Sequence, residues 1–295
     1  MKRNVRTHYG NLWSVANDLG IQNPIMEHTT LNEKFNVIPD QIPKTSNGIL
    51  RYFAIGNQGH YGWLSKNNIY LTASVDHYPE HAALYNHLPF VIREPGNDLD
   101  ADQRRKYRMR AIITASDGKP YIAYWLKVIS SENLVVQSLK STRNPDGTIT
   151  SDDWSPDSTA LNPTPPKLDT NNVDRVVTSD SFLTSSAELD LSLTKADCDA
   201  LLNVCRILFK DEHYALISEY ALVAGVDTVV NGDDGQGGVI QYSEVIGAQA
   251  VTLLTNRGYG PDDGDRGIEY LVDYGATEPL LADSGVYAKY IATVK

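Results

Sequence analysis

The chain has 295 residues, of which 41% are apolar, and its 37 acidic and 26 basic side chains give a net charge of −11. This composition is typical of an acidic globular protein, and no run of about 18 apolar residues is present that could span a membrane. The opening MKRNVRTHYGNLW is basic but lacks the apolar stretch of a secretory signal. We therefore expect synthesis in the cytoplasm and no membrane partner.

The charges divide unevenly along the chain. Residues 1–147 carry 17 basic and 13 acidic side chains, a net charge of +4, whereas residues 148–295 carry 9 and 24, a net charge of −15. The length favours two domains, and the stretch 140–172 is rich in Pro, Ser and Asn without apolar periodicity. We predict a β-rich N-terminal lobe with a basic hairpin over 1–139, a polar linker or excursion over 140–172, and an acidic α+β lobe over 173–295.

The expected elements follow from apolar periodicity and turn residues. In the first half they are a helix at 11–19, strands at 49–55 and 90–94, a helix from Pro79 to Leu88, and a hairpin over 104–129. In the second half they are short strands near 173–183, a helix that Thr194 begins, an ambiguous buried segment at 214–225, a helix at 242–258, and a terminal strand at 285–295. Short helices among many strands indicate an α+β fold, strand-rich and two-lobed, with antiparallel hairpins.

Two cysteines lie on the helix that begins at Thr194. Thr194 and Asp197 form a capping-box pattern, and Cys198 and Cys205 are seven residues apart. Two helical turns separate them by about 10 Å, which is too far for a disulfide. We expect both to be reduced core residues.

The hairpin over 104–129 allows the most detailed prediction. Asp117-Gly118 is typical of a two-residue turn, and a loop of that length places Met109 opposite Leu126 on an apolar face. In this register Arg110 lies opposite Trp125. The second face then carries cationic and aromatic residues that we expect to be exposed as an interface: Lys106, Arg108, Arg110, Tyr121, Trp125 and Lys127.

Two classes of partner suit this basic face. Alternating cations with interleaved aromatic rings can contact a nucleic-acid backbone, or they can contact the acidic surface of a neighbouring subunit. Because the second half of the chain supplies such an acidic surface, we favour a protein partner and keep DNA contact as the alternative.

The segment 77–81, HYPEH, has the H-x-x-E-H pattern of inverted zinc peptidases. That chemistry needs both histidines on one helical face, whereas Pro79 disfavours a helical conformation for Tyr78 and places His77 outside the helix. We therefore expect no catalytic residue, no cofactor and no bound metal. The candidates for a metal site are His60, His77 and His81, with His87 nearby.

Two segments rich in Gly and Asp, 231–238 and 260–267, resemble ion-binding loops in composition alone. The first lacks the Lys-Ser/Thr of a Walker loop, and the second lacks the ligand spacing of an EF-hand. We interpret both as hairpin tips. Asp283-Ser284-Gly285 matches a serine-nucleophile motif without identifiable partners, so we assign it no role.

Four segments resemble uncharacterised virion structural proteins of tailed bacteriophages: MKRNVRTHYGNLW (1–13), CRILFKDEHYALISEYALVAGVD (205–227), YSEVIGAQAV (242–251) and GATEPLL (275–281). The resemblance implies a non-enzymatic virion subunit that contacts other virion proteins. It would form a homo-oligomeric ring in the neck, as a head–tail connector or collar, or in the tail baseplate. Head-to-tail contacts close such rings, and a basic face against an acidic face would set their direction.

Two alternatives to a structural subunit remain open. One is a metal-dependent hydrolase built around His77, Glu80 and His81, together with His60. The other is a DNA-contacting connector protein, in which the basic hairpin face lines a channel.

Overall fold

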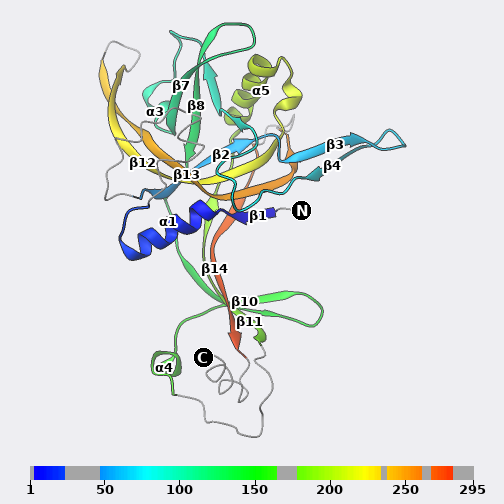
Figure 1. Ribbon diagram of the computed structural model, residues 1–295, viewed down its shortest axis with the longest axis vertical. Helices are drawn as coiled ribbons and strands as arrows, with labels where there is room; N and C mark the ends of the chain where they lie inside the picture. Colours follow the sequence, from blue (N-terminus) through cyan, green and yellow to red (C-terminus); the bar gives the residue numbers. More distant parts are fainter. Residues whose placement is uncertain (1–2, 24–46, 165–177, 234–237, 261–266, 282–295) are drawn as a thin grey trace. The chain divides into compact units, whose positions relative to one another are not determined.

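The computed structural model describes residues 3–23, 47–164, 178–233, 238–260 and 267–281 (Figure 1). Among the described residues, 50% lie in strands and 17% in helices, and the sheets are antiparallel. This confirms the predicted strand-rich α+β class. Within these ranges, no helix has the length and apolar character needed to cross a bilayer.

The chain forms two compact units that are not consecutive in sequence. Unit 1 contains residues 1–130 and 191–270, and unit 2 contains residues 131–190 and 271–295. The chain leaves unit 1 after residue 130, returns to it at residue 191 and leaves it again after residue 270, and its last described strand pairs with a strand of unit 2. These units therefore do not coincide with the three consecutive segments predicted from composition.

Unit 1 is built on an eight-stranded sheet. Its strands are β1 (Arg3–Arg6), β2 (Ile49–Gly56), β5 (His87–Leu88), β6 (Val91–Arg93), β7 (Tyr107–Thr114), β8 (Pro120–Val128), β12 (Ile217–Asp233) and β13 (Val239–Tyr259). Their order is β1-β13-β12-β2-β8-β6, with β5 also paired to β2 and β7 to β8. A separate hairpin of β3 (His60–Leu64) and β4 (Tyr70–Ser74) projects from this unit (Figure 1). The helical elements are α1 (His8–Leu19), α3 (Ala101–Arg104), α5 (Lys195–Phe209) and the 3₁₀ helix η3 (Glu212–Tyr214).

Helix α1 confirms the prediction at 11–19 and begins three residues earlier. The Thr7 hydroxyl accepts a hydrogen bond from the Gly10 N–H at 2.8 Å, and Gly20 ends the helix in the left-handed region with φ 64°. The helix lies against β13. The contact is so close at Gly10 that a Cβ there would be 2.3 Å from the carbonyl oxygen of Val251.

Helix α5 confirms the predicted capping box between Thr194 and Asp197. It lies against β6 and buries one apolar face, formed by Cys198, Leu201, Val204 and Cys205. Both cysteines are free, as predicted. Burial, followed by the nearby Asp211, raises the pKa of the Cys205 thiol to about 12, so this thiol is an apolar core group.

The predicted helix at 242–258 is wrong, because this segment lies within strand β13. A continuous apolar run fits a buried strand as well as a buried helix, and long-range pairing decides between them here. β13 pairs with β12 along most of its length, and residues 252–255 also pair with β1 on the other edge. The ambiguous segment at 214–225 enters the same sheet as β12.

The predicted helix from Pro79 to Leu88 is also wrong. This stretch is a loop that ends in β5. The N–H groups of Tyr85 and Asn86 donate to the side chain of Glu219 instead of to carbonyls one helical turn earlier. A distant carboxylate thus replaces the helical hydrogen bonds.

The β7–β8 hairpin forms as predicted, but its register differs by one residue. Its loop has three residues: the Ala115 carbonyl accepts from the Gly118 N–H at 2.9 Å, and Gly118 has φ 80°. This is a type I turn followed by a glycine bulge. Met109 therefore pairs with Trp125, and Arg110 pairs with Tyr124. A shift of one residue places every side chain of β8 on the opposite face from the predicted one.

The described residues of unit 2 form a four-stranded sheet and one short helix. Its elements are β9 (Gln137–Arg143), β10 (Ile149–Asp153), α4 (Ser158–Leu161), β11 (Thr178–Asp190) and β14 (Leu271–Leu281), with the strand order β10-β9-β11-β14. The described part of the predicted polar linker is therefore largely the β9–β10 hairpin and α4. Strand β11 covers the end of the predicted strand region at 173–183.

Several sequence predictions fall partly or wholly outside the described residues. The predicted tip at 231–238 joins β12 to β13, which pair as a hairpin, although residues 234–237 are not described. Most of the segment 260–267, Asp283-Ser284-Gly285 and the predicted strand at 285–295 lie outside the described ranges.

Candidate functional site

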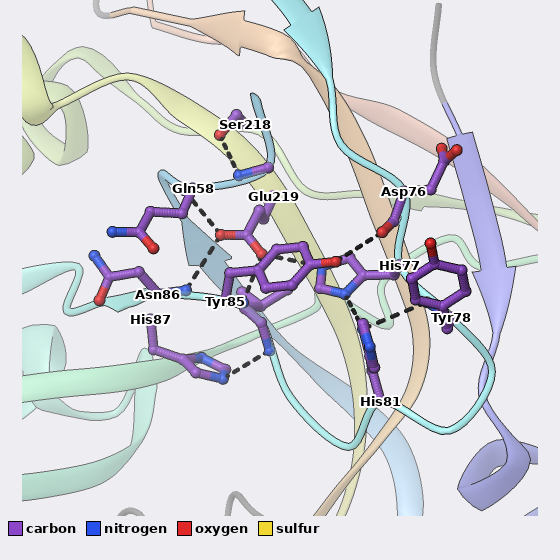
Figure 2. Close-up of polar contacts among 12 residues, drawn as sticks. Gln58, Asp76, His77, Tyr78, His81, Tyr85, Asn86, His87, Ser218 and Glu219 are labelled. Atoms are coloured by element: carbon purple, nitrogen blue, oxygen red, sulfur yellow. Dashed lines mark hydrogen bonds and ion pairs between the residues drawn. The ribbon is translucent and has the colours of Figure 1, made fainter. Parts of the chain in front are cut away.

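A buried carboxylate lies at the centre of the polar contacts drawn in Figure 2. Glu219 lies on β12 between the buried residues Ser218 and Tyr220, and none of its own side chain is exposed. An unpaired charge at such a position would cost several kcal/mol, so the position requires partners.

Three backbone N–H groups donate hydrogen bonds to this carboxylate. Gln58 and Asn86 donate to Oε1 of Glu219 at 2.9 and 3.3 Å, and Tyr85 donates to Oε2 at 2.8 Å. Gln58 follows β2, and the other two donors precede β5. The carboxylate therefore fastens both ends of segment 57–86, which contains the β3–β4 hairpin, to β12.

His77 is the fourth partner of Glu219. Its Nε2 lies 3.0 Å from Oε2 of Glu219, and its Nδ1 lies 3.0 Å from Nδ1 of His81 (Figure 2). Nδ1 of His81 also accepts from the Tyr78 N–H at 3.3 Å. The hydrogen bond to Glu219 forms when Nε2 of His77 carries a ring proton, because a carboxylate oxygen only accepts. Burial, and then His77, lowers the pKa of His81, which favours a neutral acceptor there.

Tyr85 covers this histidine pair. Its ring stacks on His77 with centroids 4.3 Å apart and planes inclined by 13°. Its hydroxyl donates to the carbonyl oxygen of Asp76 at 2.7 Å. Burial, followed by the charge of Glu219, raises the pKa of Tyr85 and keeps the hydroxyl protonated as a donor.

The candidate metal ligands are only partly brought together. His77 and His81 are neighbours, whereas His60 begins β3 and His87 accepts a hydrogen bond from the Leu84 N–H at 3.2 Å. Across the described ranges, no group of three or more His, Cys, Asp or Glu side chains is placed to hold a metal ion. Through its contact with Glu219, His77 instead holds the loop that precedes β5 against strand β12 of the sheet.

The aromatic residues predicted for the exposed hairpin face lie elsewhere. Tyr121 and Trp125 are buried, because the three-residue loop turns them to the same face as Met109. The prediction that both are exposed is therefore wrong. Lys106 is exposed as predicted.

The three other cations of that face pair with carboxylates of the same chain. The pairs are Arg108 with Asp227 at 3.3 Å, Arg110 with Asp98 at 2.9 Å, and Lys127 with Asp197 at 2.6 Å. Arg104, just before β7, pairs with Glu244 at 2.9 Å and lies over the ring of Tyr242. The charge difference between the halves of the chain is thus partly neutralised inside unit 1, where the basic hairpin meets acidic residues of the second half.

Two features of the structure were not predicted from the sequence. One is Glu219 with its backbone donors, and the signal for it was a single Glu within the apolar run 217–226. The other is the β3–β4 hairpin, and its only signal in the sequence was the presence of turn-forming residues among aromatic ones at 56–63. Its exposed large apolar side chains are Tyr61, Trp63, Leu64 and Leu71, together with Ile69 in its turn.

Comparison with known proteins places the whole chain in one family. No curated protein and no solved structure matches it. A family model described as "Family of unknown function (DUF7208)" matches residues 1–289. The chain therefore belongs to the DUF7208 family, whose function is unknown.

Proposed function

We propose that this chain is a non-enzymatic structural subunit of a tailed-phage virion, repeated as a ring in the neck (head–tail connector or collar) or in the tail baseplate. The observation that carries the proposal is the β3–β4 hairpin, which exposes five large apolar side chains along one projecting element (Figure 1). A two-stranded hairpin is marginally stable by itself in water. An exposed apolar patch of this kind is typical of a surface that another protein covers.

The anchoring of the hairpin supports this role. Glu219 fixes both ends of segment 57–86, so the base of the hairpin is held while its outer part extends. Trp63 and Tyr61 belong to the residue types that are enriched at the centres of protein interfaces. A fixed base with an apolar outer part suits insertion against a neighbouring subunit.

A second apolar surface on unit 1 offers a receiving site. Helix α1 exposes Val15 and Leu19, one turn apart, and Ile21 follows its C-terminal Gly20. This surface and the β3–β4 hairpin lie apart on unit 1 (Figure 1). A contact between two different patches is heterologous, and it closes into a ring when its rotation permits. We propose that the hairpin of one copy covers the outer face of α1 on the next, in place of contacts from Arg108 and Arg110, which have partners within the chain.

The resemblance to phage virion proteins adds independent support. Residues 3–13 include β1 and the start of α1, 205–227 include the first part of β12, and 242–251 lie in β13. These three segments are adjacent strands in the order β1-β13-β12. Three of the four resembling segments therefore lie in a connected part of unit 1, and the fourth, 275–281, lies in β14 of unit 2.

Protein composition of purified particles tests the virion assignment. We expect mass spectrometry of particles from a phage that encodes this chain to detect it at a fixed copy number per particle. Absence of the chain from purified infectious particles would overturn the assignment.

The contact itself is tested by the mass of the purified protein under native conditions. We expect one discrete oligomer for the unaltered chain, and loss of that oligomer for Leu64→Glu on the hairpin and for Leu19→Glu on α1. Ile112→Glu is the matched control, because Ile112 on β7 is 68% exposed and Leu64 is 67% exposed. Circular dichroism should show that all three variants remain folded. An oligomer that persists in both Leu64→Glu and Leu19→Glu would contradict the proposed contact.

A further inference from the structure

A cavity of about 360 Å³ opens beside the Glu219 cluster, within unit 1. One side is formed by the connection from β2 to β3, including Asn57, Gln58 and His60, with Asn86 adjacent. The other side is formed by the end of α5 and the connection to β12, including Phe209, Asp211 and Tyr214. This volume lies in the range of small-molecule sites.

Two side-chain amides in the lining are held in fixed orientations. Nδ2 of Asn86 donates to Oδ1 of Asn57 at 2.7 Å, and Nδ2 of Asn57 donates to the carbonyl oxygen of Tyr214 at 2.9 Å. An amide group carries two N–H donors and two acceptor lone pairs, so each side chain has hydrogen-bonding capacity beyond these contacts. Rigid paired donors and acceptors suit a ligand with adjacent hydroxyl groups, each of which both donates and accepts.

An aromatic wall faces the same space. The rings of Phe209 and Tyr214 have centroids 4.8 Å apart with planes inclined by 34°, and Tyr214 is exposed. The face of an aromatic ring carries partial negative charge. It therefore attracts the polarised C–H groups on one side of a saturated polyhydroxy ring.

The charges of the lining disfavour an anionic ligand. Among the described residues, the lining contains no Lys or Arg, and it contains the carboxylate of Asp211, whose Oδ1 lies 2.7 Å from Nδ1 of His213, also a lining residue. Glu219 lies directly behind, bonded to the N–H of Gln58. Burial lowers the pKa of His60, which leaves this imidazole neutral at pH 7 despite the opposing effect of Glu219. Its Nδ1 is buried without a hydrogen-bond partner within the described part of the chain.

We propose that this cavity binds a neutral saccharide, with one sugar face on the Phe209–Tyr214 wall and hydroxyl groups on Asn57, Asn86 and the His60 ring. Phosphorylated and acidic sugars are disfavoured by the carboxylates around the site. This binding activity goes beyond the proposed structural role and does not depend on it, since the cavity lies within a single copy of the chain.

Calorimetric titration of the full chain with a defined sugar panel tests the proposal. The neutral probes are glucose, galactose, N-acetylglucosamine, lactose and chitobiose, and the matched acidic probe is galacturonic acid. We expect saturable binding of at least one neutral probe with a Kd on the order of 1 mM, equivalent to about −4 kcal/mol. Galacturonic acid should bind more weakly than galactose.

Variants assign the binding to this cavity. We expect Tyr214→Ala and Asn57→Ala each to weaken binding roughly ten-fold, which corresponds to about 1.4 kcal/mol. Tyr214→Phe retains the ring and should bind within about two-fold of the unaltered chain, a difference well under 1 kcal/mol. Asn97→Ala, at an exposed position outside the cavity, should bind like the unaltered chain. Because Tyr214 is exposed, its truncation should leave the thermal unfolding midpoint nearly unchanged.

Three results would overturn the proposal. They are no saturable binding of any neutral probe, binding that Tyr214→Ala and Asn57→Ala leave unchanged, and tighter binding of galacturonic acid than of galactose. None of them would affect the ring proposal, which is measured by native mass and particle composition.

Discussion

Nε2 of His77 lies 3.0 Å from Oε2 of Glu219, and both side chains are buried in unit 1. Together with three backbone N–H donors, this pair fixes segment 57–86 to β12. The same segment carries the apolar β3–β4 hairpin and contributes Asn57, Gln58, His60 and Asn86 to the saccharide cavity. This buried contact thus supports the β3–β4 hairpin and the cavity, to both of which we assign a role.

Truncation of Glu219 should destabilise the chain strongly. Glu219→Ala leaves three N–H groups and His77 without their acceptor, and removing one partner of a buried pair costs about 3–5 kcal/mol. Glu219→Gln keeps an acceptor oxygen and should cost less. Urea unfolding followed by circular dichroism measures both, with the exposed Glu94→Ala as a control expected within about 0.5 kcal/mol of the unaltered chain. Equal stability of Glu219→Ala and Glu94→Ala would show that the contacts of Glu219 contribute little to the free energy of unfolding.

The histidines near Glu219 should make stability fall in mild acid. Burial lowers the pKa of His60 and His81 from the ordinary value of 6.5, so the unfolded chain binds these protons more readily than the folded chain. The contribution of these two histidines to the free energy of unfolding is therefore fully present above pH 6.5 and declines as the pH falls below that value. For Asp197, burial raises the pKa, but Lys127 and the hydrogen bonds from Thr194 together lower it below 3.8, so the contribution of Asp197 changes only below that pH, outside this window.

The measurement is the urea midpoint at about pH 7.5 and about pH 5.5, which bracket the titration of an ordinary histidine. We expect a lower midpoint at the acidic pH, and a smaller difference in His81→Gln. His8→Gln, at an exposed position, should keep the full difference. A midpoint that rises on acidification would contradict the lowered pKa of these two half-buried imidazoles.

Features set by neighbouring residues were predictable from the sequence, and features set by distant partners were not. The capping box of Thr194 and Asp197 lies within one helical turn, and α5 forms where it was predicted. The donors to Glu219 lie 133 to 161 residues away in the chain. No local pattern encodes that contact, although a lone Glu in the apolar strand β12 marks the position that needs it.

The hairpin shows how a small local error changes a functional prediction. The alternation along β7 was correct, with Met109 buried and Arg110 partly exposed. The turn was read as Asp117-Gly118 alone, whereas the bulge at Gly118 adds one residue to the loop. That residue moved Trp125 from the predicted partner surface into the core.

The close contact of α1 with β13 predicts different effects for two glycines. A Cβ at Gly10 would lie 2.3 Å from a backbone oxygen of Val251, and such overpacking typically costs about 1–3 kcal/mol or more. Gly20 has open space around it but a φ of 64°, which costs an alanine about 1–2 kcal/mol of backbone strain. We therefore expect Gly10→Ala to be the less stable variant in urea unfolding. A Gly10→Ala chain as stable as Gly20→Ala would place α1 farther from the sheet.

The pairing of the hairpin cations within the chain predicts a strong coupling between Lys127 and Asp197. Their side chains are 13% and 12% exposed with a 2.6 Å contact, whereas the Lys195–Asp199 pair on α5 is 47% and 57% exposed at 2.8 Å. A double-mutant cycle with Lys127→Met and Asp197→Asn should give a coupling free energy of about 1.5–3 kcal/mol, typical of a hydrogen bond between charged groups with restricted solvent access. The equivalent cycle on Lys195 and Asp199 should give less than about 0.5 kcal/mol.

The coupling free energies of the two pairs should also respond differently to salt, because partly buried charges are screened less than exposed ones. We expect the Lys127–Asp197 coupling to persist in about 1 M NaCl, where the Debye length is about 3 Å. If both pairs gave the same small, salt-sensitive coupling, the hairpin cations would be free to meet another molecule. If the strong coupling is found, a charge reversal such as Arg108→Glu would act first on folding, since Asp227 would face a second negative charge. Any effect of that variant on ring assembly would then have to be compared with its effect on the urea midpoint.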